Sequence, residues 1–470
     1  MENVYTQEKI HEIVLSQNKF FLSGKTLPVS FRIAQLKKLK AMMLKYEQDI
    51  LKALKDDLGR SEMEAYFCDV GSVILEINET IHGLKRWAKP EKHYSGLMNF
   101  PSVRTKVYKK PYGTCLIVSP FNFPFLLSIG VLIASIAGGN TSVIKASSKS
   151  KHSTDVLVKM ISETFSSDYV TVIDGGHDVA DFCLNERFDK IFYTGSPRVG
   201  VHVMECASKN LTPVALELGG ETGNWCIIRK DANLKDAASK IAFFKACNSG
   251  QICININQIA CAKEVADEFI KELKDAFTRQ LGANISKNPE YSAMITRSAF
   301  DWCLKECDEY KDRVVFGGDS DEETLKISPT VLYPIGIDED IVKHELFNPL
   351  LPVVPFDDDK IDEILDVIAT REHGLAFYLF TKDMKWANKV MATQQFGGGC
   401  INEVCVHMMA KGVPFNGTGH SGMGAYHGVW GFREFTHPCS VLKGKTHFNL
   451  KLREHPYNEK KLKLIKKFER

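Results

Sequence analysis

The chain has 470 residues, which is more than one ordinary hydrophobic core needs, so we expect two or three domains. Hydrophobic residues make up 44% and charged residues 25%, a balance typical of globular proteins, and the net charge of +2 gives no reason to expect a nucleic acid partner. Thirteen cysteines without paired spacing, and a start that does not resemble a secretory leader, favour a reduced cytoplasmic compartment over a disulfide framework.

Residues 1–90 show helical periodicity with mixed charge. Apolar residues recur at helical spacing in residues 31–54 and 67–87, so we expect helices there that pack on a core. The pattern breaks between residues 89 and 110, where proline and glycine precede an alternating segment. This break predicts a loop followed by an exposed hairpin or arm.

From Gly113 the chain alternates between short apolar strands and helices. This alternation predicts an α/β fold with a parallel, doubly wound sheet. The apolar run at residues 125–137 is only about two-thirds of the ~20 residues that a membrane span needs, so we expect a buried helix there and no transmembrane segment. The strands predicted in this part are residues 114–119, 141–145, 170–174 and 190–193.

A second α/β alternation begins near Glu221 and continues to about Phe396. It contains a predicted strand at residues 224–229, long amphipathic helices and a short apolar strand near Val353. The triple glycine at residues 397–399 is the clearest candidate for a boundary between domains, and a glycine-rich loop and a basic tail follow it.

Cys253 ends a short segment, residues 248–253, in which a Gly-Gln pair precedes the thiol. Glycine has no Cβ, so the backbone there lets the sulfur approach a carbonyl carbon. A single cysteine is more often a small buried hydrophobic residue than a nucleophile. Cys253 stands out because Asn122 and Glu217 precede it and Glu345 follows it, each within a motif of its own.

Two segments are candidates for binding an anionic cofactor. Residues 194–200 join a predicted strand to a helix, whose first N–H groups and dipole favour a pyrophosphate, but an ordinary βα turn also contains glycine. The GxGxxG fingerprint is absent from this segment. Lys145 ends another apolar strand and is either a ligand contact at the carboxyl edge of the sheet or a solvated lysine.

Asn122 and Glu217 are the polar candidates for catalysis. Asn122 lies between aromatic residues and prolines, where its amide would either stabilise an oxyanion or cap the local backbone. Glu217 ends an apolar strand before a double glycine, so it is either a partly desolvated general base or a surface glutamate. His407, His420 and His427 do not have metal-ligand spacing, so we predict no metal site.

Taken together, these segments resemble the aldehyde dehydrogenase superfamily along almost the whole chain. The stretch from Pro414 to Gly428 and the short N-terminal part resemble the class 3 branch. The resemblance implies an α/β, aldehyde dehydrogenase-like fold with two doubly wound domains, one of them Rossmann-like, and a small oligomerisation arm. The segments that carry it are Lys145 and residues 120–124, 194–200, 217–220, 250–253 and 345–347.

The resemblance also implies domain boundaries and an assembly. Residues 1–90 and 110–218 would form the dinucleotide-binding domain, and residues 219–396 would form the catalytic domain. Residues 91–109 and 397–470 would form the oligomerisation arm and the C-terminal tail. By the same analogy the protein would be a homodimer.

A member of this superfamily would oxidise a small-molecule aldehyde in two stages. Cys253, as a thiolate, would attack the aldehyde while Asn122 and the Cys253 backbone N–H stabilise the oxyanion. After hydride transfer to the nicotinamide, Glu217 would activate the water that hydrolyses the thioester to a carboxylic acid. A thiol with an ordinary pKa near ~8.5 is only slightly ionised at neutral pH, so the site must favour the thiolate.

The resemblance assigns the contacts to NAD or NADP as well. Glu345 would bind the nicotinamide ribose, Phe347 would pack beside the nicotinamide, and Lys145 would reach the adenosine ribose. The other predicted cofactor contacts are Ser148, Gly195, Ser196 and Gly200.

Ser148 is the first of four departures from the family pattern. It stands where an acid commonly binds the adenosine ribose hydroxyls. The missing carboxylate removes a repulsion against a 2′-phosphate, and Lys149 and Lys151 lie nearby. We therefore expect NADP to be accepted alongside NAD, with a preference for NADP as the stronger form of this prediction.

The other three departures lie around the predicted catalytic residues. The chain between Glu217 and Cys253 is two residues longer than usual, within residues 221–230, and residues 254–257 do not match the class 3 pattern. Asparagines 348 and 416 stand where glycines are usual. These differences leave the aldehyde and the geometry of its site open.

Two other functions remain open, as does the role of the tail. A CoA-acylating enzyme would release its thioester to a thiol, and Glu217, as a water-activating base, argues against it. A non-catalytic binding protein would have no use for Cys253, Glu217 and Asn122 together. The basic segment 460–468 predicts an amphipathic helix that docks on protein, covers the substrate entrance or contacts an anionic membrane, and we favour docking.

Overall fold

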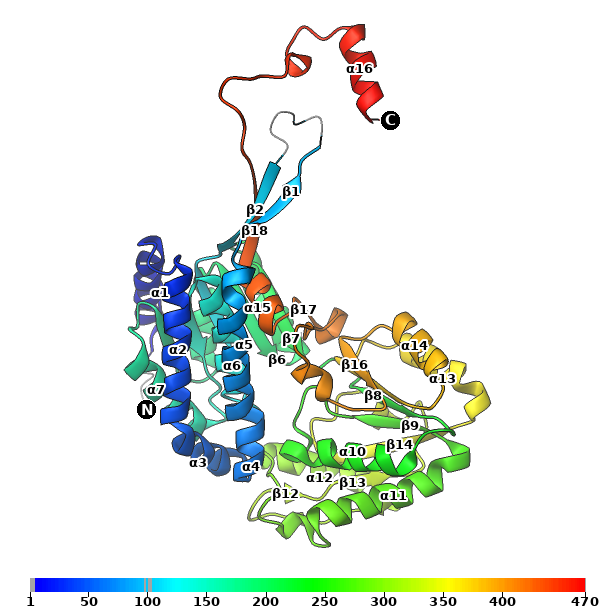
Figure 1. Cartoon of the computed structure of the whole chain (residues 1–470). Coiled ribbons are helices and arrows are strands. Elements are labelled where there is room, and N and C mark those ends of the chain that lie inside the picture. The colour runs from blue at the N-terminus through cyan, green and yellow to red at the C-terminus, as the bar shows by residue number, and fades with distance from the viewer. Residues whose placement is uncertain (1–4, 97–98, 100–103, 470) are drawn as a thin grey trace.

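The computed structural model describes residues 5–96, 99 and 104–469 (Figure 1). It has two α/β parts side by side, and an arm of strands that projects from one of them. Residues 97–98 and 100–103 of the predicted arm, and residue 470 of the predicted tail, lie outside the described residues. The α/β prediction is confirmed, since each part is built on its own sheet.

A six-stranded sheet forms the core of the first part. Its strands are, in order, β17 (Gly422–Met423), β7 (Val214–Leu218), β6 (Lys190–Gly195), β3 (Thr114–Val118), β4 (Thr141–Lys145) and β5 (Val170–Ile173). The strands pair in parallel except β17, which is antiparallel to β7. The strand order reverses between β3 and β6, and ligands of open α/β sheets bind at such a switch point.

Helices cover both faces of this sheet. They are α1 (Gln7–Leu22), α2 (Val29–Lys45), α3 (Glu47–Leu58), α4 (Glu62–Ala65), α5 (Ser72–Trp87), α6 (Leu126–Gly138), α7 (Lys151–Thr164), α8 (His177–Asn185), α9 (Pro197–Ser208) and α15 (Gly428–Glu434). Alternate residues of β3 serve the two faces, since Leu116 packs with α1, α8 and α9 whereas Ile117 packs with the other helices. Every residue of α6 is buried, as its apolar sequence predicts.

A seven-stranded sheet forms the second part. Its strands are, in order, β10 (Val314–Phe316), β13 (Thr330–Leu332), β14 (Leu350–Phe356), β9 (Gln258–Ala262), β8 (Trp225–Ile228), β15 (Ala376–Phe380) and β16 (Gly398–Ile401). All pairs are parallel except that between β10 and β13. Its helices are α10 (Leu234–Ala246), α11 (Lys263–Leu281), α12 (Arg297–Glu309), α13 (Ile361–Ala369) and α14 (Met384–Thr393), and a small ladder pairs β11 (Ser320–Asp321) with β12 (Lys326–Ile327).

The triple glycine does not end the second sheet. Gly398 and Gly399 belong to β16, which pairs with β15, so this sheet continues past residue 396. Farther along, β17 returns to the first sheet and pairs with β7. Glycine-rich sequence has little strand propensity, which is why both strands were assigned to the arm and tail from the sequence.

The N-terminal helices are interrupted where the sequence predicted continuous ones. The predicted helix at residues 31–54 is two helices, α2 and α3, which meet at Tyr46. The predicted helix at residues 67–87 begins as a π-helix, Tyr66–Gly71, and continues as α5. A π-helix carries one extra residue in its turn, and such turns are frequent at functional sites.

The predicted arm is confirmed as an exposed antiparallel sheet. It consists of β1 (Glu91–Tyr94), β2 (Arg104–Pro111) and β18 (Thr436–Leu442). Beyond it the chain forms α16 (Glu459–Glu469), which lies away from both α/β parts in Figure 1. Among the helices of the described residues, none has the length and apolar sequence that a membrane crossing requires.

Candidate active site

Cys253 lies on a short turn that follows α10. The turn places Asn248 and Ser249 in the left-handed region, with φ of 52° at both residues. Gly250 also has a positive φ, and a Cβ at this position would collide with the backbone carbonyl of Asn348. Glycine is therefore required at residue 250, for a contact with the chain that the sequence alone does not show.

Cys253 and Glu217 line the same narrow chamber. The chamber has a volume of about 60 Å³, and its other walls are mostly aromatic and aliphatic side chains and cysteines. Glu217 is the penultimate residue of β7 and is 3% exposed, and neither of its carboxylate oxygens has a hydrogen-bond partner among the described residues. The fold thus brings together a thiol and an unpartnered carboxylate that are 36 residues apart in the sequence.

Burial changes the proton affinity of both groups. It raises the pKa of Cys253 to about 12, and the carboxylates of Glu345 and Glu217 add to this shift. It also raises the pKa of Glu217 well above that of an ordinary glutamate, with a further contribution from Glu434. A neutral thiol beside a proton-accepting carboxylate is the arrangement that base-assisted thiolate formation needs.

Asn122 lies in the loop after β3, next to the turn that carries Cys253. Its Nδ2 donates a hydrogen bond to the Gln251 carbonyl at 3.1 Å, and its own carbonyl accepts one from Asn248 Nδ2 at 3.1 Å. Asn122 is buried, and its hydrogen bond to Gln251, which precedes Cys253 by two residues, holds its amide in a fixed orientation.

A buried ion pair supports this loop, and sequence reasoning missed it. Arg60 Nη1 lies 2.5 Å from Asp69 Oδ2, and Arg60 also donates to the Asn122 carbonyl and, at 3.0 Å, to Asn248 Oδ1. Asp69 Oδ1 accepts the backbone N–H groups of Phe125 (3.0 Å) and Leu126 (2.8 Å). The two residues are nine positions apart and have no motif in common, so no local pattern marks them as a pair.

Two further asparagines hold the other side of the turn. Asn224 Nδ2 donates to the carbonyls of Cys253 and Asn255, both at 2.8 Å. Asn257 Oδ1 accepts the backbone N–H of Asn224 at 2.7 Å, and Asn257 Nδ2 donates to the Leu346 carbonyl at 2.7 Å. The departures at residues 254–257 and 221–230 are therefore coupled, because residues from the two stretches bond each other.

Glu345 and Phe347 reach the site from the segment before β14. Glu345 Oε1 is buried without a partner among the described residues, and burial raises the pKa of this carboxyl to about 8. A Cβ at Gly219 would overlap that carboxylate, so the double glycine allows the close approach. Phe347 packs edge-to-face on Phe121, with ring centroids 6.0 Å apart.

The remaining predicted residues lie at the carboxyl edge of the first sheet. Gly195 ends β6, Ser196 is the N-cap residue of α9, and a Cβ at Gly200 would meet Leu218 at 2.9 Å. The loop with Asn122 and the start of α9 therefore flank the switch point between β3 and β6. The carboxyl edge of this sheet is also where the sequence predicts the binding of an anionic cofactor.

Lys145 and Ser148 differ in their surroundings. Lys145 is buried and donates to the carbonyls of Ala146 (2.7 Å) and Gly175 (2.8 Å), and burial lowers its pKa. Ser148 is exposed. Lys151 lies 3.1 Å from Asp174, an acid that follows β5 and adds a negative charge at this edge.

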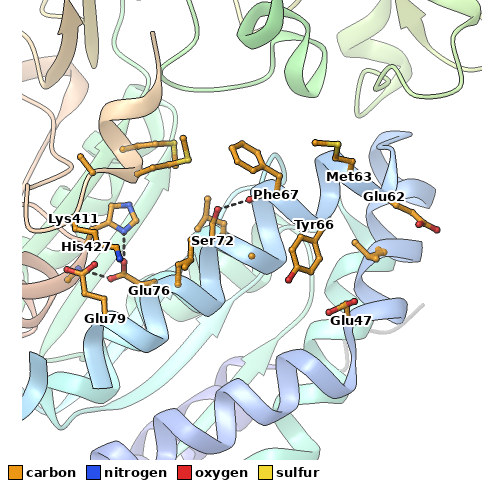
Figure 2. Close-up of a pocket in the computed structure, with 18 of the residues that line it drawn as sticks. Glu47, Glu62, Met63, Tyr66, Phe67, Ser72, Glu76, Glu79, Lys411 and His427 are labelled. Carbon is orange, nitrogen blue, oxygen red and sulfur yellow. Dashed lines mark hydrogen bonds and ion pairs between the residues drawn. The ribbon is translucent and has the colours of Figure 1, made fainter. Parts of the chain in front are cut away.

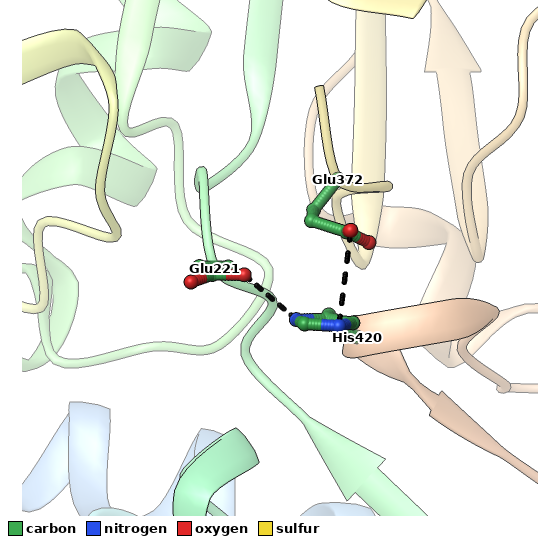
Figure 3. Close-up of side chains that lie close together, drawn as sticks. All are labelled: Glu221, Glu372 and His420. Atoms are coloured by element: carbon green, nitrogen blue, oxygen red, sulfur yellow. Dashed lines mark ion pairs between the residues drawn. The ribbon is translucent and has the colours of Figure 1, made fainter. Parts of the chain in front are cut away.

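A His/Glu cluster lies near the site on the surface (Figure 3). His420 Nδ1 is 2.7 Å from Glu221 and His420 Nε2 is 3.8 Å from Glu372. One ligand atom from each of the three residues lies within 4.8 Å of the others, so the donors are close enough for a cation. Their side chains are about half exposed, which is also typical of ordinary surface ion pairs. Sequence spacing could not reveal this cluster, because three distant segments form it.

A wider cavity opens from the chamber toward the surface. It has a volume of about 710 Å³ and is bounded by α3, α4, the π-helix, α5 and residues 408–412 (Figure 2). Five residues line both spaces: Phe67, Ser72, Leu126, Met408 and Met409. The two spaces are therefore adjacent, with these five side chains at their common boundary.

Comparisons with known proteins agree with this geometry. The sequence profile of the aldehyde dehydrogenase family matches residues 3–441. A 4,4'-diaponeurosporen-aldehyde dehydrogenase of Staphylococcus aureus is 37% identical, covering 96% of both chains. Aldehyde dehydrogenase family 3 member A2 of Pongo abelii is 37% identical over 94% of this chain and 90% of its own.

Among solved structures, an aldehyde dehydrogenase of Staphylococcus aureus in a substrate-bound state superposes with a TM-score of 0.94. It is 36% identical, and the match covers 98% of this chain and 99% of that one. The predicted fold and the predicted resemblance to the class 3 branch are both confirmed. The chain therefore belongs to the aldehyde dehydrogenase family and is an NAD(P)-dependent oxidoreductase that acts on aldehydes.

Proposed function

We propose that the protein oxidises a long, apolar aldehyde to its carboxylic acid through a thioester on Cys253, with hydrolysis assisted by Glu217. The observation that carries this proposal is the shared apolar chamber, which holds a thiol and a buried, unpartnered carboxylate. Buried polar groups are rarely left without a partner, so such an exception indicates a role with substrate or water.

Cys253 is the proposed nucleophile and Asn122 the proposed oxyanion stabiliser. An amide NH₂ group has two donors, and Asn122 uses one of them on Gln251, so the other remains for the oxygen of the aldehyde. The backbone N–H of Cys253 would supply the second donor. Fixed donors stabilise a developing oxyanion without reorganising, which is the strongest single contribution in acyl-transfer chemistry.

Glu217 is the proposed base for both stages. It would accept the thiol proton first and later the proton of the water that attacks the thioester carbonyl. Its raised pKa brings a carboxyl group closer to neutral pH, where proton transfer is most effective. The hydrolytic route follows because this base lies in the chamber itself.

The residues at the two sheet edges fit NAD or NADP. Glu345 has a buried unpartnered oxygen for a ribose hydroxyl, and the N-terminus of α9 offers free N–H groups for phosphate. Lys145 and Phe347 would hold the adenosine ribose and the nicotinamide. When bound, the cofactor accepts the hydride of the substrate. Acceptance of NADP is supported by Ser148 and opposed in part by Asp174.

The long apolar substrate is supported by the shape of the route. The chamber and the 710 Å³ cavity give an aldehyde with an extended body a mostly apolar path to Cys253. The Staphylococcus aureus relative is named for 4,4'-diaponeurosporen-aldehyde, and it is 37% identical to this chain. A substrate of this kind would reach the thiol with its aldehyde end first.

The assignment of domains and assembly is also a proposal. Residues 1–90 and 110–218, which form most of the six-stranded sheet and its helices, would bind the cofactor, and residues 219–396, which form most of the seven-stranded sheet, would supply Cys253. The exposed arm at residues 91–109 and the segment 397–470 would join two copies into a homodimer, since the arm presents unpaired strand edges. Thirteen free thiols support a cytoplasmic location.

Reduction of NAD and of NADP by decanal, without CoA, tests the proposed function. We expect steady formation of reduced cofactor in the wild type and none in Cys253→Ala. Cys439→Ala, which removes a half-buried thiol of the arm, is the matched control and should retain activity. A strict requirement for CoA would contradict the hydrolytic route, and unchanged activity in Cys253→Ala would contradict the whole mechanism.

A further inference from the structure

The outer cavity is apolar inside, but its charged residues are almost all of one sign. The carboxylates lie on α3, α4 and α5, and the lysine, on the loop after Met409, lies at the same end of the cavity as Glu76 and Glu79 (Figure 2). Together these side chains give the mouth a formal charge of −3. The charged residues lining the cavity are Glu47, Glu62, Glu76, Glu79 and Lys411.

One of these carboxylates is already paired within the protein. Glu76 accepts the backbone N–H of Gly428 at 2.7 Å and lies 3.4 Å from His427 Nδ1. Within the described part of the chain, no ion pair is recorded for Glu47, Glu62 or Glu79. Glu62 is exposed and the other two are half-buried, so their negative charge faces whatever enters the cavity.

The charge of the mouth matters because the cavity adjoins the catalytic chamber. The two spaces share five lining residues, and at the inner end Glu217 is a buried carboxylate without a partner among the described residues. A long aldehyde that reaches Cys253 by this route leaves its far end among the acidic side chains. The electrostatic field of these acidic side chains therefore acts on the end of the substrate that is farthest from Cys253.

From this arrangement we infer that the entrance selects substrates by charge. It accepts aldehydes whose far end is neutral or cationic and rejects aldehydes that carry a second, anionic group. Unpaired charges act over about 10 Å at 0.1 M salt, and apolar walls focus their field, so three carboxylates around one opening influence a charged group inside it. The inference rests on the proposed function and names its substrate class.

Matched substrates separate this charge effect from simple apolarity. We would measure kcat/KM for two C9 aldehydes, one ending in a carboxylate (9-oxononanoate) and one ending in a trimethylammonium group, with nonanal as the neutral reference. An apolar channel alone disfavours both ions, whereas an acidic mouth favours the cation over the anion. We expect the wild type to prefer the cation by roughly tenfold, and to lose most of this preference in 0.5 M NaCl.

Substitutions at the mouth should shift this preference in opposite directions. Glu62→Gln with Glu79→Gln should lower it about threefold or more, and Lys411→Gln should raise it about twofold. Glu309→Gln with Glu363→Gln, on the exposed surfaces of α12 and α13, changes the net charge equally and should leave it unaltered.

Three results would overturn the inference: a preference for the anion, no change in the double variant at the mouth, or shifts in one direction for both mouth variants. A misfolded variant cannot imitate the expected pattern, because the predicted shifts have opposite signs. If nonanal itself is not oxidised, the proposed function fails, and that outcome is distinct from a failure of charge selection.

Discussion

The site around Cys253 has two walls, which differ in how completely their polar groups are hydrogen-bonded. On one wall, Arg60 and Asp69 fix Asn122 and the turn before the thiol through direct bonds. On the other, the buried carboxylates of Glu217 and Glu345 have oxygens without a hydrogen-bond partner among the residues that the structure describes. Proteins normally pair their buried polar groups. The first wall, whose groups are hydrogen-bonded, therefore fixes the position of the thiol and of Asn122. The carboxylates of the second wall are available for contacts with substrate, cofactor or water.

The largest loss of activity should come from a substitution of Glu217, on the second wall. Glu217→Gln keeps the shape of the side chain but removes the base, so kcat should fall by roughly 10²–10⁴. Acylation of Cys253 should also slow, because the thiol loses the base that accepts its proton. A thiolate can still form at alkaline pH, so rapid mixing at alkaline pH should show a burst of about one reduced cofactor per site. Hydroxylamine, which cleaves thioesters, should restore turnover. Normal turnover in this variant would show that the unpartnered carboxylate has no catalytic role.

On the wall formed by Arg60 and Asp69, the expected effect of a substitution is a loss of folding stability. Asp69→Ala removes the nearer of the two carboxylates that pair with the buried Arg60 and leaves only Glu64, at 3.5 Å, which should lower the free energy of unfolding by about 3–5 kcal/mol. The matched control is Glu163→Ala, which breaks an exposed pair with Lys45 and should cost less than about 1 kcal/mol. Urea unfolding of both variants measures the difference, and equal losses would refute the assigned role of the buried pair.

The pH dependence of stability should reveal Glu345. Its pKa rises from 4.5 to about 8 on folding. The folded state therefore holds this proton more tightly, and the resulting stability is complete below pH 4.5 and is lost as the pH rises through about 8. Glu345→Gln should flatten the decline of unfolding free energy over this range by at most about 1.4 kcal/mol per pH unit. An unchanged slope would contradict the burial of this carboxyl.

The smallest effect should appear at the outer edge of the cofactor site. Ser148→Glu restores a negative charge there and should reduce kcat/KM for NADP relative to NAD by about tenfold. Ser148→Gln has a similar size without the charge and serves as the control. If both variants change the cofactor ratio equally, Asp174 rather than Ser148 determines the charge at this edge.

Much of the fold could be predicted from the sequence because it depends on local patterns. The strands β3, β4 and β5 and the buried helix α6 appear close to their predicted bounds, since continuous apolar runs mark elements buried on both faces. The strands β16 and β17 could not be predicted, because glycine has little strand propensity and their pairing partners are distant in the sequence.

The predicted site was incomplete in a systematic way. Residues within motifs, such as Cys253 and Glu217, could be found because the chain around them is unusual. The supporting residues Arg60, Asp69 and Asn224 could not, because each acts through hydrogen bonds to segments that are distant in the sequence. Their importance follows from burial and bonding, which only the three-dimensional structure supplies.

The π-helix Tyr66–Gly71 has a consequence for how the entrance could change during evolution. A single extra residue in this turn determines which side chains, among them Phe67 and Cys68, face the route to the thiol. Deleting one residue here would restore an ordinary helical turn and rotate the preceding segment by about 100° relative to α5. One deletion in the gene could therefore replace the lining of the entrance while every catalytic codon remained unchanged.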